Sequence, residues 1–494
     1  MALPGVVQTI TDGALGTVPA DSSANTAVIG IASSGTVDTV YSYTSSDAID
    51  SLRTTNGYGP GPEAAAYDLA TDGSPVYFVR ADSTGGTAAA CSAVTLTGTG
   101  PDPGVTVSVA TTFDDYQVKV LMVLGGAVAT STFKYSLDNG DTYSATITTA
   151  ATYAIPNTGI TIAFTAGTYV AGDVYSFTAT AAAYSTTKLG TAVDALLASS
   201  NQFGLLQVVG RPAGANDGAK ATAYASMVAA VQTKLDTAAG AYRYCRAICD
   251  GPDVANDSTA DALLTAAFAA TDAARVVATA GDAEMYSALV SGRRHKRPTG
   301  WAITARARQI PIHEEPGFVG RGSLGSSIAL KTAETTPTQY LDSRTRSTLH
   351  DARFATLRTH IGLQGIYVTQ ALTMANALSD FKTLPLGRVM DRACQVAYTE
   401  LLRLVNGTVR VNASTGYILE QDAIAIENRV AAVVRAAITQ PGHASSATVT
   451  VNRNTNLLTT PNLKTKIRIV PLGYLTTITN EIGYLNPALF VAAA

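Results

Sequence analysis

The sequence predicts an α/β protein whose core is a mostly parallel sheet, with an all-β unit inserted into it. Short apolar strands at 26–32, 75–81 and 203–210 alternate with helical segments, and this alternation is typical of parallel strands joined by crossover helices. Between 91 and 184 the pattern changes to six or seven short alternating strands separated by turn residues, which indicates a small β-sandwich. With 494 residues, the chain is long enough for several domains.

The composition favours self-association and excludes several classes of protein. Only 14% of the residues are charged and the mean hydropathy is +0.16, so much of the surface is expected to be covered by other copies. A net charge of −3 gives no electrostatic basis for nucleic-acid contact. The N-terminus lacks a signal-peptide pattern, and the longest apolar run, 120–129, is too short for membrane insertion. Four cysteines do not form a disulfide framework, so we expect synthesis in a reducing cytoplasm.

The first 184 residues divide into three predicted parts. Residues 1–25 contain glycines, prolines and a polar "ADSSAN" stretch, and they predict an extended arm. Residues 26–90 form the first part of the core, with a helix at 62–73 that begins near Pro62 and stops at Gly73. Residues 91–184 form the inserted β unit, in which Asn139 and Gly140 supply the positive φ angles of a hairpin turn.

The α/β rhythm returns over 185–345. A long helix follows 217, with Tyr224, Val228, Val231 and Leu235 on one face. Strands are predicted at 242–251 and 274–281, a helix at 283–292, and irregular structure over 293–345.

The last two predicted parts are a C-terminal core domain over 346–472 and an arm over 473–494. Helices are predicted at 384–407 and 420–439, followed by a strand at 447–454 and by an alternating strand that carries Lys464, Lys466 and Arg468. Pro471 and Gly473 interrupt this pattern, and a further extended run follows from Tyr474 to Ile482. No later strand can pair with it. It must join an earlier strand, join another molecule or remain in solvent.

Two stretches of the sequence could form a catalytic or phosphate-binding site, but neither matches a specific motif. Asp250, Asp253, Asp257 and Asp261 follow a predicted parallel strand, where α/β enzymes bind ligands, but Asp residues there are also ordinary turn and N-cap residues. The basic run Arg293, Arg294, His295, Lys296 and Arg297, with Arg306 and Arg308, could contact phosphates. It could equally form salt bridges to a neighbouring chain or to Glu314 and Glu315.

Three further patterns are better explained by structural roles than by metal or phosphate binding. His313 and Glu314 are adjacent on an extended chain and point to opposite faces, so they do not readily chelate one metal ion. Gly210, Gly214 and Gly218 match no phosphate-binding motif, and Cys245 and Cys249 lack the second thiol pair of a zinc site. We therefore expect no catalytic residues, no cofactor and no metal.

Ordered motifs in the chain resemble those of the sheath proteins of contractile bacteriophage tails. The N-terminal arm precedes "TAVIGIASSGTVDTVYSYTSSDAIDSLRTTNGYG" and "SPVYFVRA", and the C-terminal third contains "PIHEEPGFVGRG", "DARFATLRTHIGLQGIYVTQALTMANALSDF", "RVMDRACQVAYTELL" and "IRIVPLGYLTTITNEIGYLNPAL". The likeness covers about 1–90 and 185–494, and the β-rich insert falls where such proteins vary. Both a phage tail and a phage-derived injection particle fit this pattern.

The resemblance implies a structural subunit that forms stacked hexameric rings around a tail tube and contracts by rigid-body rearrangement. It implies partners among copies of itself, the tube protein, and baseplate and tail terminator proteins, with assembly in the host bacterial cytoplasm and a final place in the virion tail. Strands reaching into neighbours are assigned to Val6, Val7, Thr9, Ile10, Tyr474, Thr476, Ile478 and Ile482, hinges to Gly13, Gly16, Pro471 and Gly473, and possible tube contacts to Arg388, Arg392 and Arg403. The alternatives are a non-contracting self-assembling phage protein and an α/β enzyme that uses the Asp250–Asp261 loop.

Overall fold

The computed structural model describes residues 21–45, 48–100, 103–255, 257–325, 329–331 and 341–484. Its central sheet has the order β17-β16-β15-β1-β3-β2. Five strands are parallel, and β2 is an antiparallel edge strand. The strands are β1 (Thr26–Gly30), β2 (Val40–Tyr43), β3 (Val76–Arg80), β15 (Leu205–Val208), β16 (Arg246–Cys249) and β17 (Val276–Ala278). The predicted mostly parallel core is confirmed.

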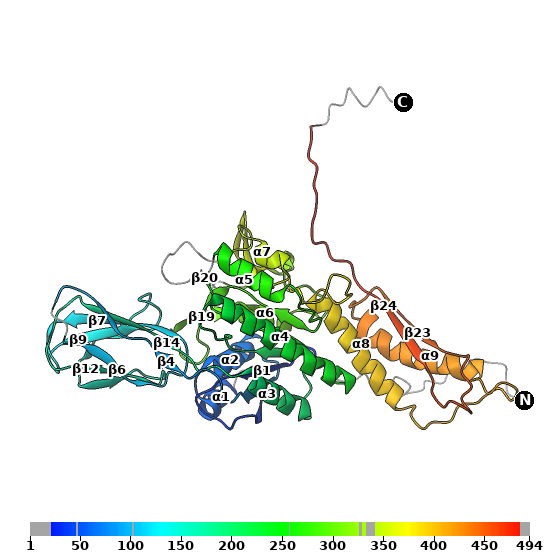
Figure 1. Cartoon of the computed structure of the whole chain (residues 1–494). Helices are drawn as coiled ribbons and strands as arrows, with labels where there is room; N and C mark the ends of the chain where they lie inside the picture. Colours follow the sequence, from blue (N-terminus) through cyan, green and yellow to red (C-terminus); the bar gives the residue numbers. More distant parts are fainter. Residues whose placement is uncertain are drawn as a thin grey trace, which may run out of the picture.

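Helices cover both faces of this sheet (Figure 1). One face packs against α3 (Thr186–Ala198), α4 (Asp217–Gly240) and α5 (Ser258–Phe268), and the other against α1 (Ile49–Asn56), α2 (Pro60–Asp72) and α6 (Gly300–Gln309). The predicted stripe on α4 is real, because Tyr224, Val228, Val231 and Leu235 are all buried. Tyr224 also donates a hydrogen bond to the carbonyl of Cys249 at 2.9 Å, which ties α4 to the end of β16.

An all-β unit lies at one end of the elongated molecule (Figure 1). Its main sheet has the order β10-β9-β7-β14-β4, with β5 also on β14, and a second sheet has the order β11-β12-β6. The strands are β4 (Ala90–Cys91), β5 (Thr95–Thr97), β6 (Val105–Ala110), β7 (Tyr116–Leu124), β8 (Gly126–Ala127), β9 (Thr132–Ser136), β10 (Ile147–Thr148), β11 (Thr152–Ala154), β12 (Ile160–Phe164), β13 (Thr168–Tyr169) and β14 (Val174–Thr180). Asn139 and Gly140 have φ angles of 61° and 97°, as the hairpin signal predicts.

The predictions over 283–345 are wrong in two places. Residues 282–298 form a β-hairpin of β18 (Asp282–Tyr286) and β19 (Arg294–Pro298), joined by β20 (Ala329–Lys331), where a helix and irregular structure were predicted. Alternate residues Ala283 and Met285 are buried, and this period of two overrides the helical propensity of the segment. The second error is the helix α6, which lies where irregular structure was predicted. Nine of its ten residues are buried, so the helix has no polar stripe and its sequence shows no amphipathic pattern.

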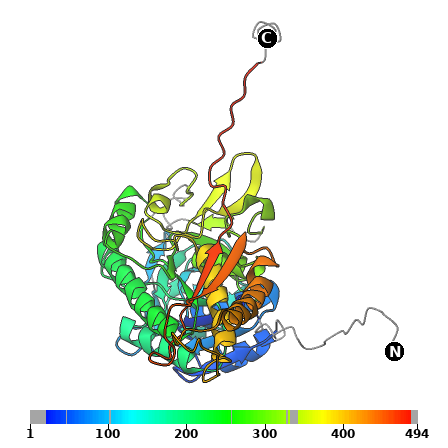
Figure 2. The same ribbon diagram turned by 90° about the vertical axis from the view of Figure 1, so that its right-hand side faces the viewer.

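The C-terminal region forms a separate hydrophobic cluster at the other end of the molecule (Figure 1), the end that faces the viewer in Figure 2. It contains α8 (Leu384–Leu402), α9 (Glu420–Val434), a π-helical turn (Arg435–Thr439), β23 (Ser446–Val451) and β24 (Thr465–Val470). In the sequence, α6 and α8 are separated by η2 (Val319–Arg321), α7 (Thr348–Asp351), β21 (Leu357–His360) and β22 (Leu363–Val368), and the last three pack on the core. Among the described helices, none is long and apolar enough to cross a membrane.

Candidate assembly site

A two-stranded antiparallel sheet, β23 with β24, lies on α9. The face toward α9 carries the half-buried side chains of Val449, Ile467 and Ile469, which join the C-terminal hydrophobic cluster. The opposite face carries the exposed side chains of Lys466 and Arg468, as the alternation in the sequence predicts. In the described chain this sheet has no third strand, so the outer edge of β24 is open to an added strand. On the edge of β23, the Val451 amide already donates to Glu427 and the Val451 carbonyl accepts from Arg453.

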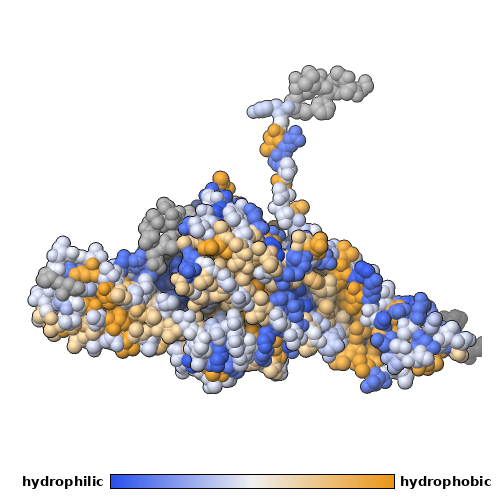
Figure 3. All heavy atoms as spheres, viewed as in Figure 1, coloured by the Kyte–Doolittle hydropathy of each residue, from blue (hydrophilic) through white to orange (hydrophobic). Residues whose placement is uncertain are grey.

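The chain beyond β24 leaves the body of the molecule. At its root, the Ser445 hydroxyl donates to the carbonyl of Pro471 at 3.1 Å, and the Tyr474 hydroxyl donates to the carbonyl of His313 at 2.5 Å. After Tyr474 the described segment runs as extended chain that pairs with no described strand, and it projects away from all layers (Figures 1 and 3). Ile478 is 77% exposed and Ile482 is 87% exposed, and Thr476 is exposed too. This segment, 474–484, is called the C-terminal arm below.

Part of the predicted N-terminal arm cannot be placed. Val6, Val7, Thr9 and Ile10, with Gly13 and Gly16, lie outside the described residues. The described chain begins at 21. There, the Asp21 carboxylate lies 3.9 Å from the Arg392 guanidinium, and the Ser23 carbonyl accepts a hydrogen bond of 3.0 Å from Arg388.

The three arginines predicted as possible tube contacts have different surroundings. Arg388 is buried and donates to the carbonyls of Ala307 and Ser23, and burial lowers its pKa to about 10. Arg392 is also buried and bonds to Gln395 at 2.9 Å. Arg403 lies near the surface and pairs with Glu400 at 2.9 Å. In this chain Arg388 and Arg392 therefore hold the start of the described N-terminal segment against α8, and a tube contact remains a prediction.

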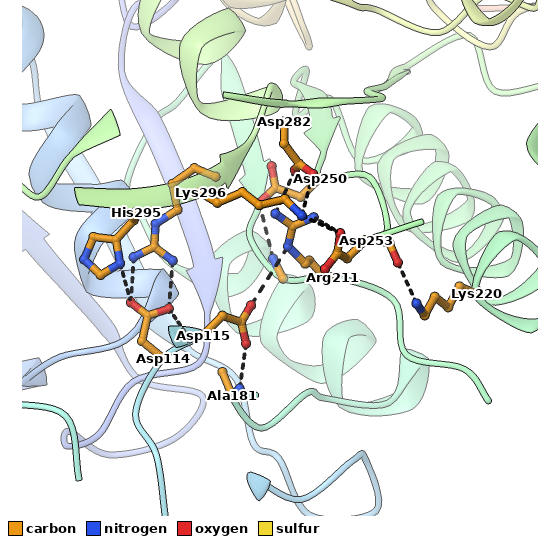
Figure 4. A network of polar contacts seen from close by, with 12 residues as sticks. Asp114, Asp115, Ala181, Arg211, Lys220, Asp250, Asp253, Asp282, His295 and Lys296 are labelled. Atoms are coloured by element: carbon orange, nitrogen blue, oxygen red, sulfur yellow. Dashed lines mark hydrogen bonds and ion pairs between the residues drawn. The ribbon is translucent and has the colours of Figure 1, made fainter. Parts of the chain in front are cut away.

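The basic run packs against acidic residues from distant parts of the chain (Figure 4). Arg297 donates two hydrogen bonds to the buried Asp114 of the β unit, at 2.7 and 2.6 Å. Lys296 pairs with Asp253 at 2.9 Å, and Arg211 pairs with Asp282 at 2.7 Å. A cleft of about 1310 Å³ between the β unit and the carboxyl ends of the core strands is lined by Arg211, Asp253, Lys296 and Arg297. The Arg297–Asp114 pair joins the insert to the core, and the other two pairs lie within the core.

The other cations of this region also have structural partners. Arg293 donates to the Pro156 carbonyl of the β unit at 3.1 Å, and Arg294 donates to the Tyr286 hydroxyl at 2.9 Å. Arg306 donates to the carbonyls of Gly322 and Ser323, and Arg308 pairs with Asp72 at 2.6 Å. The run does form ion pairs, through Lys296 and Arg297, but Glu314 and Glu315 were the wrong partners. Glu314 pairs with Arg321, and Glu315 accepts a hydrogen bond from the Ala371 amide.

The four aspartates of the candidate enzyme loop do not converge on one point. Asp250 is buried and accepts a hydrogen bond from the Trp301 indole at 3.0 Å. Asp253 belongs to the ion pairs above, which lower its pKa to about 2. The Asp257 side chain caps α5 by accepting from the Ala260 amide, and Asp261 pairs with Arg346 at 2.8 Å. Each carboxylate has a local structural partner, and the four do not form an acid–base pair.

Asp250 gives the folded state a testable pH dependence. Burial raises its pKa to about 7, against an ordinary value of 3.8. The folded state therefore binds a proton more tightly than the unfolded chain. Proton binding at Asp250 therefore contributes to the free energy of unfolding. This contribution is fully present below about pH 4 and is lost as the pH rises through about 7.

We expect Asp250→Asn to be more stable than the parent protein at pH 8, by on the order of 4 kcal/mol, and nearly equal to it at pH 4. The amide mimics the protonated carboxyl and cannot ionise. Thermal melts from pH 4 to 8 measure the difference, with the exposed Asp194→Asn as the control. A constant difference across this range would contradict the assignment.

The remaining candidates are also structural. His313 and His443 face each other through their Nδ1 atoms at 2.8 Å, Glu314 forms a bidentate pair with Arg321, and Glu315 accepts from the Ala371 amide. Cys245 and Cys249 are buried in the core, and burial raises the pKa of the Cys245 thiol to about 12. Gly210 approaches the Tyr184 ring, and Gly214 approaches the backbone of α4. Within the described part of the chain, no group of three or more His, Cys, Asp or Glu residues is placed to hold a metal ion.

The layered core, the inserted β unit and the C-terminal cluster together have the fold of contractile sheath subunits. The sheath of the extracellular contractile injection system PVC in its contracted state aligns with a TM-score of 0.53 at 11% identity, over 98% of both chains. The helical sheath of the anti-feeding prophage in its contracted state aligns with a TM-score of 0.52 at 10% identity, over 98% of this chain and 99% of that one. A sheath tail protein from Desulfitobacterium hafniense aligns with a TM-score of 0.45 at 10% identity, over 95% and 100%.

The chain belongs to the DUF2586 family, because the model of the DUF2586 N-terminal domain matches residues 3–372. No curated protein matches the chain. The resemblance to tail sheath proteins that the sequence motifs indicate is confirmed in the fold.

Proposed function

We propose that this protein is the structural subunit of a contractile sheath and has no catalytic activity. The observation that carries the proposal is the exposed C-terminal arm with its isoleucines, which follows a two-stranded sheet whose β24 edge is open among the described strands. An isolated chain gains nothing from exposing Ile478 and Ile482, whereas a polymer buries them against another copy. The match of nearly the whole chain to two contracted sheaths supports the same conclusion.

In the proposed assembly, hexameric rings stack around a tail tube and each arm adds a strand to the sheet of a neighbour. Val6–Ile10 would serve in the same way as the C-terminal arm, with hinges at Gly13, Gly16, Pro471 and Gly473. Contraction then moves the subunit bodies as rigid units while the strands stay paired. The division of the chain at residues 25, 90, 184, 345 and 472 is part of this proposal.

The proposed partners follow from this role. They are further copies of the chain, a tube protein, and baseplate and terminator proteins, in a phage tail or a related injection particle assembled in bacterial cytoplasm. The ion pairs of the Asp250–Asp261 loop support a structural role for that region.

Electron microscopy of the purified protein tests the proposal. We expect hollow, striated tubes at high protein concentration, because the chain carries both the strand and its acceptor edge. Closed shells or flat sheets would favour a non-contracting assembly. A protein that stays monomeric at all concentrations and is stabilised by a small ligand would contradict the proposal.

A further inference from the structure

The strand β24 has one apolar and one basic face. Lys464, Lys466 and Arg468 point away from α9 and are exposed, while Ile467 and Ile469 point toward it. Among the described residues, no carboxylate lies within ion-pair distance of these three cations, although most other cations of the chain have such a partner. Three neighbouring positive charges on one face repel one another, so this face is suited to an acidic partner.

The outer edge of β24 is also ready to accept a strand. The Asn452 amide donates to the Lys464 carbonyl at 2.8 Å, so Lys464, directly before β24, is one of the residues whose backbone groups bond on the β23 side. Along an antiparallel pair, residues that bond to the partner strand alternate with residues whose backbone groups point away from it. The backbone N–H and C=O groups of Thr465, Ile467 and Ile469 therefore point to the outer edge of β24. In the described chain these backbone groups have no strand beside them.

The C-terminal arm has the same two-faced pattern. Its alternation places Ile478 and Ile482 on one face, with Asn480 between them, and Leu475, Thr477, Thr479 and Glu481 on the other. Glu481 is the only charged residue in the sequence from 474 to the C-terminus, and it is exposed. When such a strand pairs with β24, one of the two orientations of its faces matches better. In that orientation the isoleucines lie beside isoleucines and the carboxylate lies beside the cations.

We propose that the arm of one copy adds to the outer edge of β24 in a second copy, and that Glu481 selects the facing by pairing with the row Lys464, Lys466 and Arg468. The inference rests on the proposed function, since it assumes that the arm joins another subunit. A slip by one residue would turn Glu481 toward the apolar cluster under β24 and leave its charge without a partner. The edge of β23 offers no such selection, because its outward side chains are Ser446, Thr448 and Thr450.

A charge swap tests this proposal. We expect Glu481→Lys to raise the protein concentration needed for tube formation about tenfold at low salt, because an attraction becomes a repulsion. The difference should narrow at 1 M salt, where exposed charges are screened. Adding Lys466→Glu and Arg468→Glu to the same chain should restore assembly, and Glu481→Gln should lie between the parent protein and Glu481→Lys. Sedimentation and electron microscopy measure the tubes, and circular dichroism checks that each variant is folded.

The outcomes separate this inference from the proposed function. If Glu481→Lys assembles as the parent does while deletion of the arm prevents assembly, the arm is correct and the charge selection is overturned. If Glu481→Lys assembles poorly and the further changes Lys466→Glu and Arg468→Glu do not restore assembly, the assignment of the β24 edge as the binding site of the arm is overturned. If the chain without its arm still forms tubes, the arm itself is not the link.

Discussion

Deleting residues 474–494 should leave a folded subunit that no longer forms tubes. Within the described part of the arm, the contact with the body is the hydrogen bond from Tyr474 to His313, and Ile478 and Ile482 add nothing to any core. The subunit therefore loses little of its own stability. The polymer loses a strand whose hydrogen bonds contribute about 0.5–1.5 kcal/mol each, together with the burial of two isoleucines at each link.

Size-exclusion chromatography and thermal melting measure the fold of the truncated chain, and electron microscopy measures assembly. The double variant Ile478→Asp with Ile482→Asp should give the same loss at full length. As a matched control, Leu378→Asp changes an apolar side chain that is 95% exposed outside the arm, and it should assemble normally. Tubes from the truncated chain would show that subunits join through other surfaces.

The C-terminal arm and the β23–β24 sheet are the part of the candidate site that the sequence predicts best. Alternation of Lys466 and Arg468 with Ile467 and Ile469 is a local signal for a strand with one buried face. The strands of the core are equally clear, since each is a short apolar run bounded by turn residues. These strands can be predicted from local sequence patterns because burial of their apolar side chains leaves a direct trace in the order of apolar and polar residues.

The polar contacts of the structure could not be predicted in the same way. Arg297 pairs with Asp114, which lies 183 positions earlier in the chain, and Arg388 bonds to Ser23, which lies 365 positions earlier. No spacing rule links such residues, because the fold alone brings them together. The strand β18 was missed for a related reason. Its Ala, Glu and Met residues favour helix, and only pairing with β19 and β20 makes it a strand.

A buried charge cluster joins the core to the C-terminal region through α8. Asp391 on α8 pairs with Arg246 of β16 at 2.8 Å and with Arg275 at 3.1 Å. The Arg246 side chain is only 2% exposed, and Gly387 leaves room for it, since a Cβ there would lie 1.8 Å from the guanidinium carbon. Burial lowers the pKa of Arg246, and Asp391 opposes this effect by stabilising the charged form.

Asp391→Ala should therefore loosen α8 from the core. Removing the carboxylate leaves the buried Arg246 without its counter-charge, a change that costs about 3–5 kcal/mol in buried sites. Arg275 keeps the exposed Asp236 as its counter-charge. Hydrogen-exchange protection of the α8 backbone amides should fall by about two to three orders of magnitude, while amides of the β unit keep theirs. Asp236→Ala is the matched control, because Asp236 lies 3.5 Å from the same Arg275 but is 60% exposed, and we expect an effect below about 1 kcal/mol. Equal protection of α8 in both variants would mean that apolar packing, and not this charge cluster, holds the C-terminal region in place.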